Sequence, residues 1–126
     1  MIRTKTDYRL LPEGIYHLTV SRKPKLENKS GYDYYVFDFE AVDKNGYKQD
    51  YREFFFPNEE RLKKVLLEFG GTEDREGEVQ VDEDDVVGEF LTAEIKHVVI
   101  KGRTRAKIER VVKEKKADED EEEPPF

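Results

Sequence analysis

The sequence predicts an all-β domain of five strands, with a single helix between the third and the fourth strand. Two observations lead to this fold class. Short segments rich in β-branched and aromatic residues alternate with turn residues, and one segment has apolar residues at helical spacing. The 126 residues, 36% hydrophobic and 42% charged, supply one compact core and hardly two. We therefore expect one domain over residues 1–112 and a flexible acidic tail over residues 113–126.

The first strand is expected over residues 15–20, directly after a turn at residues 11–14. Its residues are mostly β-branched and aromatic, as is typical of strands. Residues 22–31 are polar and contain the breakers Pro24 and Gly31. This segment is therefore expected to form an exposed loop.

The second and third strands are expected to form a hairpin. Residues 34–42 alternate between two faces, and one face is expected to be buried. The members of that face are Tyr35, Phe37, Phe39 and Ala41. The dipeptide Asn45-Gly46 is a strong hairpin signal and returns the chain into a third strand over residues 47–56.

The helix is expected after Pro57, with Asn58 as the N-cap residue. Apolar residues follow at helical spacing, and Gly70 ends the pattern. They are Leu62, Val65, Leu66 and Phe69. One face of the helix is therefore expected to pack against the core.

The remaining body is expected to hold two more strands, over residues 90–101 and 104–112, joined at Gly102-Arg103. The acidic stretch before them, residues 72–85, is expected to be a loop, followed by a single helical turn at residues 86–88. This element order is that of the OB-fold, a five-stranded Greek-key barrel known for binding oligonucleotides. An SH3-like barrel or an unrelated α+β sheet would have the same elements.

Charge is distributed unevenly along the chain, whose formal net charge is −7. Residues 1–56 hold ten Lys and Arg against nine Asp and Glu, and residues 57–89 hold four against twelve. Residues 90–116 hold nine against three, whereas the last ten residues hold six acids and no base. An acidic protein with such a basic stretch is compatible with a polyanionic ligand.

The C-terminal segment carries the most specific motif. It is an acidic run closed by Pro-Pro-Phe: Asp118, Glu119, Asp120, Glu121, Glu122, Glu123, Pro124, Pro125 and Phe126. This segment resembles the acidic tip of bacterial and phage single-stranded-DNA-binding proteins, with Pro124 in place of the usual Ile. The resemblance implies docking of replication, recombination and repair proteins, in which Phe126 enters an apolar pocket and the acids steer the encounter.

Aromatic side chains on the hairpin are the candidates for stacking on bases, because nonspecific single-strand binding needs flat π surfaces beside a cationic groove. The predicted platform consists of Tyr34, Tyr47, Tyr51 and Phe55. Tyrosine is favoured because its hydroxyl prefers water. Six other aromatic residues are expected in the core: Phe37, Phe39, Phe54, Phe56, Phe69 and Phe90.

Basic residues fall where an OB-fold would use them to bind phosphates. Four lie in the loop after the first strand, two in the third strand, and five in or between the last two strands. They are Arg22, Lys23, Lys25, Lys29, Lys48, Arg52, Lys96, Lys101, Arg103, Arg105 and Lys107.

The sequence offers few residues that could catalyse a reaction. There is no cysteine, and the two histidines, His17 and His97, have no partner at a catalytic spacing. The acidic run at residues 82–85 lacks the spaced ligands of a calcium loop. No catalytic residue, metal site or cofactor is predicted.

The charged N-terminal residues do not form a secretory signal, and no apolar run could span a membrane, so we expect a cytoplasmic protein in a bacterial or phage-infected cell.

These observations predict non-enzymatic, largely sequence-independent binding and protection of single-stranded DNA in replication, recombination or repair. The alternative is an OB-like adaptor that binds protein through the acidic segment 57–89. An accessory nuclease would lack the residues for catalysis. One OB-fold covers only a few nucleotides, so self-association, with a homodimer as the simplest form, is expected to raise the apparent affinity.

Overall fold

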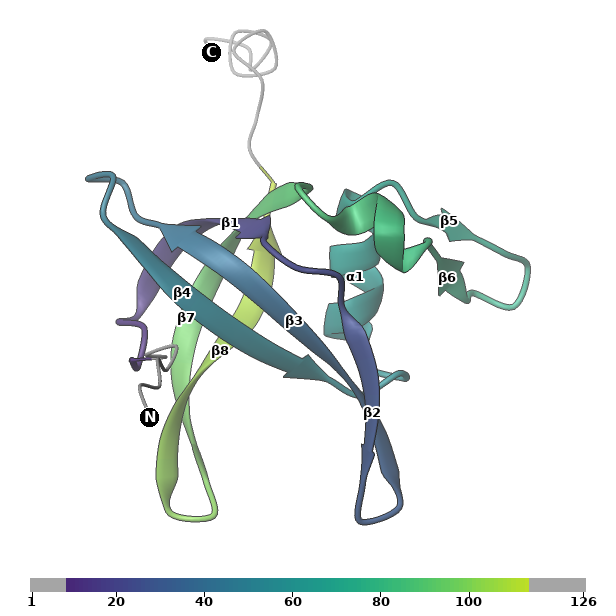
Figure 1. Cartoon of the computed structure of the whole chain (residues 1–126), viewed down its shortest axis with the longest axis horizontal. Coiled ribbons are helices and arrows are strands. Elements are labelled where there is room, and N and C mark those ends of the chain that lie inside the picture. The colour runs from purple at the N-terminus through teal and green to yellow at the C-terminus, as the bar shows by residue number, and fades with distance from the viewer. Residues whose placement is uncertain (1–8, 114–126) are drawn as a thin grey trace, which may run out of the picture.

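The structure, a computed structural model, describes residues 9–113; residues 1–8 and 114–126 lie outside the described part. The chain forms a six-stranded antiparallel sheet, one helix and a second sheet of two short strands (Figure 1). The elements are β1 (Gly14–Val20), β2 (Lys25–Lys29), β3 (Tyr32–Val42), β4 (Lys48–Phe55), α1 (Glu60–Glu68), β5 (Thr72–Glu73), β6 (Val79–Gln80), β7 (Phe90–Ile100) and β8 (Arg103–Val112).

The large sheet has β1 at its centre, between β3 and β7. Strand β3 also pairs with β2 and β4, and β7 pairs with β8. Within residues 9–113, β4 and β8 are not paired with each other, so the sheet is open. The prediction of a mostly β domain with one helix is confirmed, whereas the sheet does not close into a barrel.

The segment over residues 22–31, predicted to be a loop, contains strand β2. All five β2 residues are exposed, and their sequence has little strand preference, so pairing with β3 is what makes the segment a strand. The turn after it, at Ser30 and Gly31, has φ angles of 55° and 83°. Two successive positive φ angles are what a tight type I′ hairpin turn requires.

The acidic segment over residues 72–85 also has more structure than predicted. It contains the short strands β5 and β6 and the start of a 3₁₀ turn at Glu83–Val86. This turn begins at Asp82, whose side chain accepts a hydrogen bond from the backbone N–H of Asp84 at 2.9 Å. The helical turn predicted at residues 86–88 therefore lies three residues earlier.

Burial alternates along β3 and β4 and defines the inner face of the sheet. Phe37, Phe39 and Ala41 are buried and Tyr35 is half-buried, as predicted. On β4 the inward residues are Tyr51, Glu53 and Phe55, because they pair with the inward residues of β3. Register thus decides which aromatic residues of β4 enter the core.

Three of the six phenylalanines predicted in the core are exposed instead. The exposed fractions are 41% for Phe54, 51% for Phe56 and 59% for Phe90. Phe54 pairs with Val36 on the outer face of β3 and β4, and Phe90 pairs with Thr19. The other three, Phe37, Phe39 and Phe69, are buried as predicted.

Helix α1 packs on the core through Leu62 and Val65. Its N-cap residue is Glu59 rather than the predicted Asn58, and the Glu59 carboxylate accepts a hydrogen bond from the backbone N–H of Phe56 at 3.0 Å. The helix ends as predicted at Gly70, where φ is 84°. Figure 1 shows α1 and the β5–β6 hairpin together on one side of the large sheet.

Candidate nucleic-acid interface

The outer face of β3 and β4 carries a pair of aromatic rings. Tyr34 and Phe54 meet edge to face with ring centroids 5.9 Å apart. Tyr32 lies two residues earlier on β3, so its side chain points to the same face, and it is 68% exposed. We call Tyr32, Tyr34 and Phe54 the aromatic face. Such flat, partly exposed rings are suited to stacking on bases.

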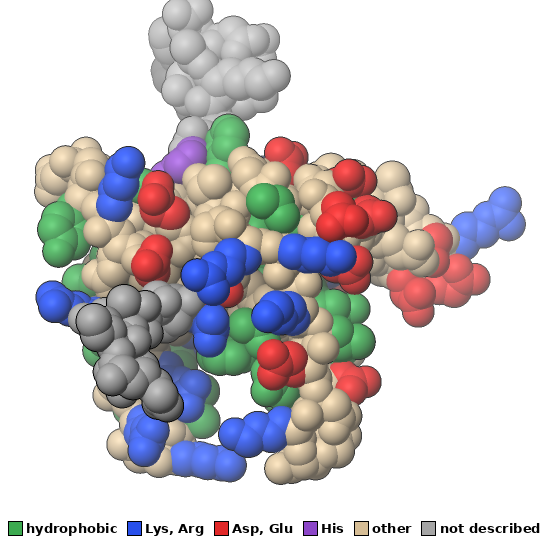
Figure 2. Space-filling model, in the orientation of Figure 1, with side chains coloured by type: hydrophobic (Ala, Val, Ile, Leu, Met, Phe, Trp, Pro, Cys, Tyr) green, Lys and Arg blue, Asp and Glu red, His purple; other side chains and the backbone are tan. Residues whose placement is uncertain are grey.

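Two hairpins extend from the sheet, and one of them, β2–β3, carries Tyr32 and Tyr34 of this face. Figure 1 shows the β2–β3 hairpin and the β7–β8 hairpin extending beyond the core at the same end of the molecule. Figure 2 shows Lys and Arg side chains on both sides of the hollow between them. The aromatic face and the two hairpins together form the candidate interface.

The β7–β8 hairpin is the more strongly basic of the two. Residues 95–108 include five Lys and Arg and no acid. The register pairs Lys96 with Lys107, and Val98 with Arg105, so the cations of both strands share one face. Arg103 and Arg105 are exposed and form no ion pair with any other residue between 9 and 113. These two guanidinium groups can therefore meet phosphates without first breaking an ion pair.

The β7–β8 turn is also tight. Its two central residues, Lys101 and Gly102, have φ angles of 50° and 77°, the pattern of a type I′ turn. The turn predicted at Gly102-Arg103 thus lies one residue earlier. Lys101 adopts the left-handed conformation, which is uncommon for a residue other than glycine.

The β2–β3 hairpin is mixed in charge. Lys25 and Lys29 are exposed, but Glu27 and Asp33 accompany them. Upstream, Arg22 is exposed, whereas Lys23 lies 3.2 Å from Asp84. The hydrogen bond to Asp84 raises the pKa of Lys23.

Two predicted phosphate ligands lie on β4. Arg52 shares the outer face with the aromatic pair, and its Nε lies 2.7 Å from Asp38 Oδ1. A phosphate would have to compete with that carboxylate. Lys48 is exposed at the other end of β4, where it pairs with Val42, far along the strand from Phe54.

Two members of the predicted stacking platform are in the core. Tyr51 is 4% exposed and Phe55 is fully buried, so neither ring can stack on a ligand base. Both point inward because they pair with the buried side of β3. Tyr47 is 66% exposed but lies at the β3–β4 turn, at the opposite end of the hairpin from Tyr32. The structure brings Tyr34 together with Phe54, a residue that the sequence predicts to be buried.

Beneath the aromatic face lies a buried polar cluster of Tyr51, Glu53 and Arg61. Tyr51 donates its hydroxyl hydrogen to Glu53, and Arg61 Nη1 lies 2.6 Å from Glu53 Oε1. Burial raises the pKa of Glu53, and the hydrogen bond from Tyr51 and the charge of Arg61 oppose that rise. Burial likewise raises the pKa of Tyr51. The three side chains satisfy one another inside the protein, and none of them belongs to the aromatic face.

Both histidines have partners within the protein. His97 Nε2 lies 2.8 Å from the Leu11 carbonyl oxygen, and its backbone N–H donates to Glu13. That hydrogen bond lowers the pKa of Glu13. His17 stacks at a tilt on Phe90, with ring centroids 4.6 Å apart. Among residues 9–113, His, Asp and Glu side chains do not gather into a group of three that could hold a metal ion.

The predicted partner-binding residues, Asp118 to Phe126, lie outside the described residues. The part of the chain that the structure describes has no helix long and apolar enough to cross a bilayer. No protein-family model matches the sequence, and no curated protein matches it either.

Proposed function

We propose that this protein binds single-stranded DNA without enzymatic activity and with little sequence preference. The observation that carries the proposal is the Tyr34–Phe54 pair on an open sheet face, together with residues 95–108 of the β7–β8 hairpin, which hold five Lys and Arg and no acid. Such binding needs aromatic rings that stack on bases and cations that contact phosphates, and unpaired guanidinium groups serve as those cations here. The proposal includes protection of transient single strands in replication, recombination and repair, and recruitment of partners through Asp118 to Phe126.

We further infer that the sheet is an OB-type barrel opened at one seam. The strand order β4-β3-β1-β7-β8 would close if β4 met β8. Side chains already span that gap, since Tyr51 Oη lies 3.4 Å from the Ala106 carbonyl oxygen and Arg61 Nη1 lies 2.9 Å from that of Ile108. In an OB-fold, the second and third strands and the loops beside them bind oligonucleotides. Their counterparts here carry the aromatic face and the two tight turns.

Fluorescence anisotropy with a labelled poly-dT oligonucleotide tests the proposal. Binding should be tight at about 50 mM salt and weaken steeply by about 200 mM, because cations that neutralise phosphates release counterions. The comparison variant is Arg103→Gln/Arg105→Gln, which should bind more weakly at low salt. Its matched control is Lys44→Gln/Arg75→Gln, which removes the same charge from exposed positions outside the interface. Absence of binding at low salt would overturn the proposal in favour of the protein-binding adaptor.

A further inference from the structure

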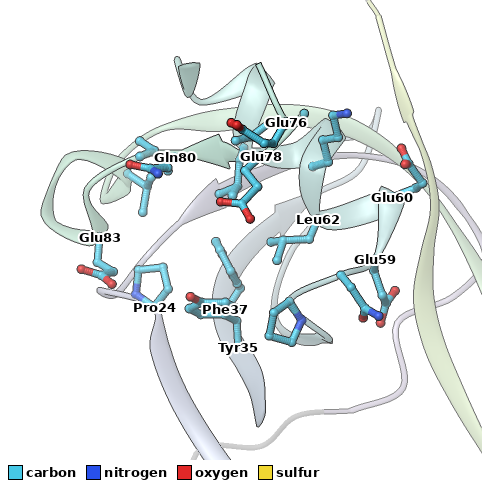
Figure 3. Close-up of a pocket in the computed structure, with 18 residues that line it drawn as sticks. Pro24, Tyr35, Phe37, Glu59, Glu60, Leu62, Glu76, Glu78, Gln80 and Glu83 are labelled. Carbon is cyan, nitrogen blue, oxygen red and sulfur yellow. The ribbon is translucent and has the colours of Figure 1, made fainter. Parts of the chain in front are cut away.

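A pocket of about 830 Å³ lies on the side of the molecule that carries α1 and the β5–β6 hairpin (Figure 3). Its floor is apolar and includes Phe37 from β3, Leu62 from α1 and Pro24. Acidic residues stand around this floor from three elements: Glu60 on α1, Glu76 and Glu78 on the β5–β6 hairpin, and Glu83 on the 3₁₀ turn. We call these four glutamates the acidic rim. The aromatic face and the basic hairpin are not part of this pocket.

Nearby cations offset the acidic rim only in part, because Lys63 near Glu60 and Lys23 near Glu83 are each paired with another carboxylate. The pocket lining has one basic residue, Lys63, and its Nζ already lies 2.7 Å from Glu73. None of the four rim glutamates forms an ion pair with another residue between 9 and 113. Like charges held around an apolar floor favour an occupant that brings cations together with an apolar group.

This chain itself has an exposed element with that chemistry, the tip of the β7–β8 hairpin. Val99 is 71% exposed and Ile100 is 43% exposed, although both are apolar. Lys101 and Arg103 adjoin them, and the stretch contains no acid. The tight turn at Lys101 and Gly102 keeps the tip narrow, as insertion into a pocket requires.

The tip cannot reach the pocket of its own chain. Figure 1 shows the β7–β8 turn at the lower left and the β5–β6 hairpin at the upper right, at opposite ends of the molecule. We propose that the β7–β8 tip of one copy inserts into the pocket of a second copy, with Val99 and Ile100 over the apolar floor and the tip cations against the acidic rim. This goes beyond the proposed function, because it needs no DNA.

Such a contact is head to tail, because it joins two different surfaces of the same chain. A dimer formed in this way still has one free tip and one free pocket, so further copies can add. A single hairpin tip covers little area, which makes the contact weak and dependent on concentration. Its charge complementarity makes it dependent on salt as well.

Two charge-reversed variants of the full chain provide the test. The tip variant is Arg103→Glu/Arg105→Glu, in which both the tip and the rim are acidic. The rim variant is Glu76→Lys/Glu78→Lys, in which the tip is basic and the rim has lost its acidic character. Each variant alone should associate about tenfold more weakly than the natural chain, because opposite charges no longer face each other. An equimolar mixture should associate again, because the reversed tip fits the reversed rim.

Sedimentation velocity at low salt, without DNA, measures these states over a concentration series. The control Lys44→Glu/Lys48→Glu changes the net charge by the same amount as the tip variant at the β3–β4 turn, and should associate like the natural chain. Circular dichroism shows whether each variant is folded. If the rim variant still binds poly-dT, the DNA interface is separate from the acidic rim. A natural chain that stays monomeric at the highest concentration, or variants whose mixture does not associate, would overturn the proposal.

Discussion

Glu53 and Arg61 form an ion pair inside the protein, with Arg61 Nη1 2.6 Å from Glu53 Oε1, and the Glu53 side chain is 3% exposed. The same Nη1 donates to the Ile108 carbonyl oxygen at 2.9 Å, and Arg61 Nη2 lies 2.8 Å from Glu59. One guanidinium therefore links β4, α1 and β8 where β4 and β8 do not pair. Its planar group also lies over the Phe55 ring, with Arg61 Cζ 4.7 Å from the ring centroid.

Replacing Arg61 by alanine should destabilise the fold severely, because it leaves the Glu53 carboxylate buried without its cation. Loss of one partner of a buried ion pair typically costs about 3–5 kcal/mol. Arg61→Lys should recover only part of the loss, since an ammonium group lacks the planar fork that reaches several acceptors. Urea unfolding measures the free energies. The control is Arg110→Ala, which removes an exposed pair with Glu94 and should cost about 1 kcal/mol or less. Equal losses in Arg61→Ala and Arg110→Ala would contradict this role.

Stability should depend on pH through Glu53. Burial raises the pKa of its carboxyl above the ordinary 4.5, so the folded state keeps the proton to higher pH than the unfolded state does. The free energy of unfolding contributed by this group is therefore fully present below the ordinary value and falls as pH rises through the folded pKa. The variant Glu53→Gln has no such titration. Unfolding of both proteins from about pH 4 to pH 7 should show the natural chain losing stability relative to Glu53→Gln. A relative gain with rising pH would mean that the charge of Arg61 outweighs burial.

Removing a ring from the aromatic face should weaken DNA binding without unfolding the protein. Tyr34→Ala and Phe54→Ala should each cost about 1–3 kcal/mol in poly-dT affinity, which is the usual contribution of base stacking. Tyr47→Ala is the matched control, because it removes an exposed ring at the opposite end of the hairpin. Fluorescence anisotropy gives the affinities. If only Tyr47→Ala weakened binding, the interface would lie at the β3–β4 turn instead.

Cations on the β7–β8 hairpin should act on all DNA sequences alike, because phosphate contacts carry no base information. Replacing Lys101, Arg103 and Arg105 together by glutamine should flatten the plot of log affinity against log salt by about 0.7 for each phosphate that the variant no longer neutralises. The measurement is a salt titration on dT, dC and dA oligonucleotides. Selective loss for one base would show that the hairpin reads bases.

The acidic C-terminal segment should compete with DNA for the basic surface. Deletion of Asp118 to Phe126 removes six acids and should raise poly-dT affinity, most strongly at low salt, where the Debye length is about 30 Å at 0.01 M. Deletion of Phe126 alone should leave DNA affinity unchanged and abolish partner recruitment, because only the apolar anchor is removed. Calorimetry and pull-down separate the two effects. Weaker DNA binding after the longer deletion would refute the competition.

Local sequence patterns were sufficient for most of the elements. Alternation over β3, the turn residues before β4 and the helical spacing of Leu62 and Val65 each predict the observed structure. These signals are local, since a period of two or 3.6 residues and a turn residue depend on the chain alone. The basic character of residues 95–108 is equally visible in the sequence.

Tertiary structure decided which side of β4 faces the core. Its two faces read Tyr51, Glu53, Phe55 and Asp50, Arg52, Phe54, so the more aromatic face also carries an acid that needs a partner before it can be buried. The register with β3 makes the choice, and Arg61, eight residues further on, supplies the charge that allows Glu53 to be buried. Pairing with β3 likewise makes the polar residues 25–29 a strand. These outcomes depend on contacts between segments. For that reason the sequence predicts Phe55 in the candidate interface, whereas the structure places Phe54 there.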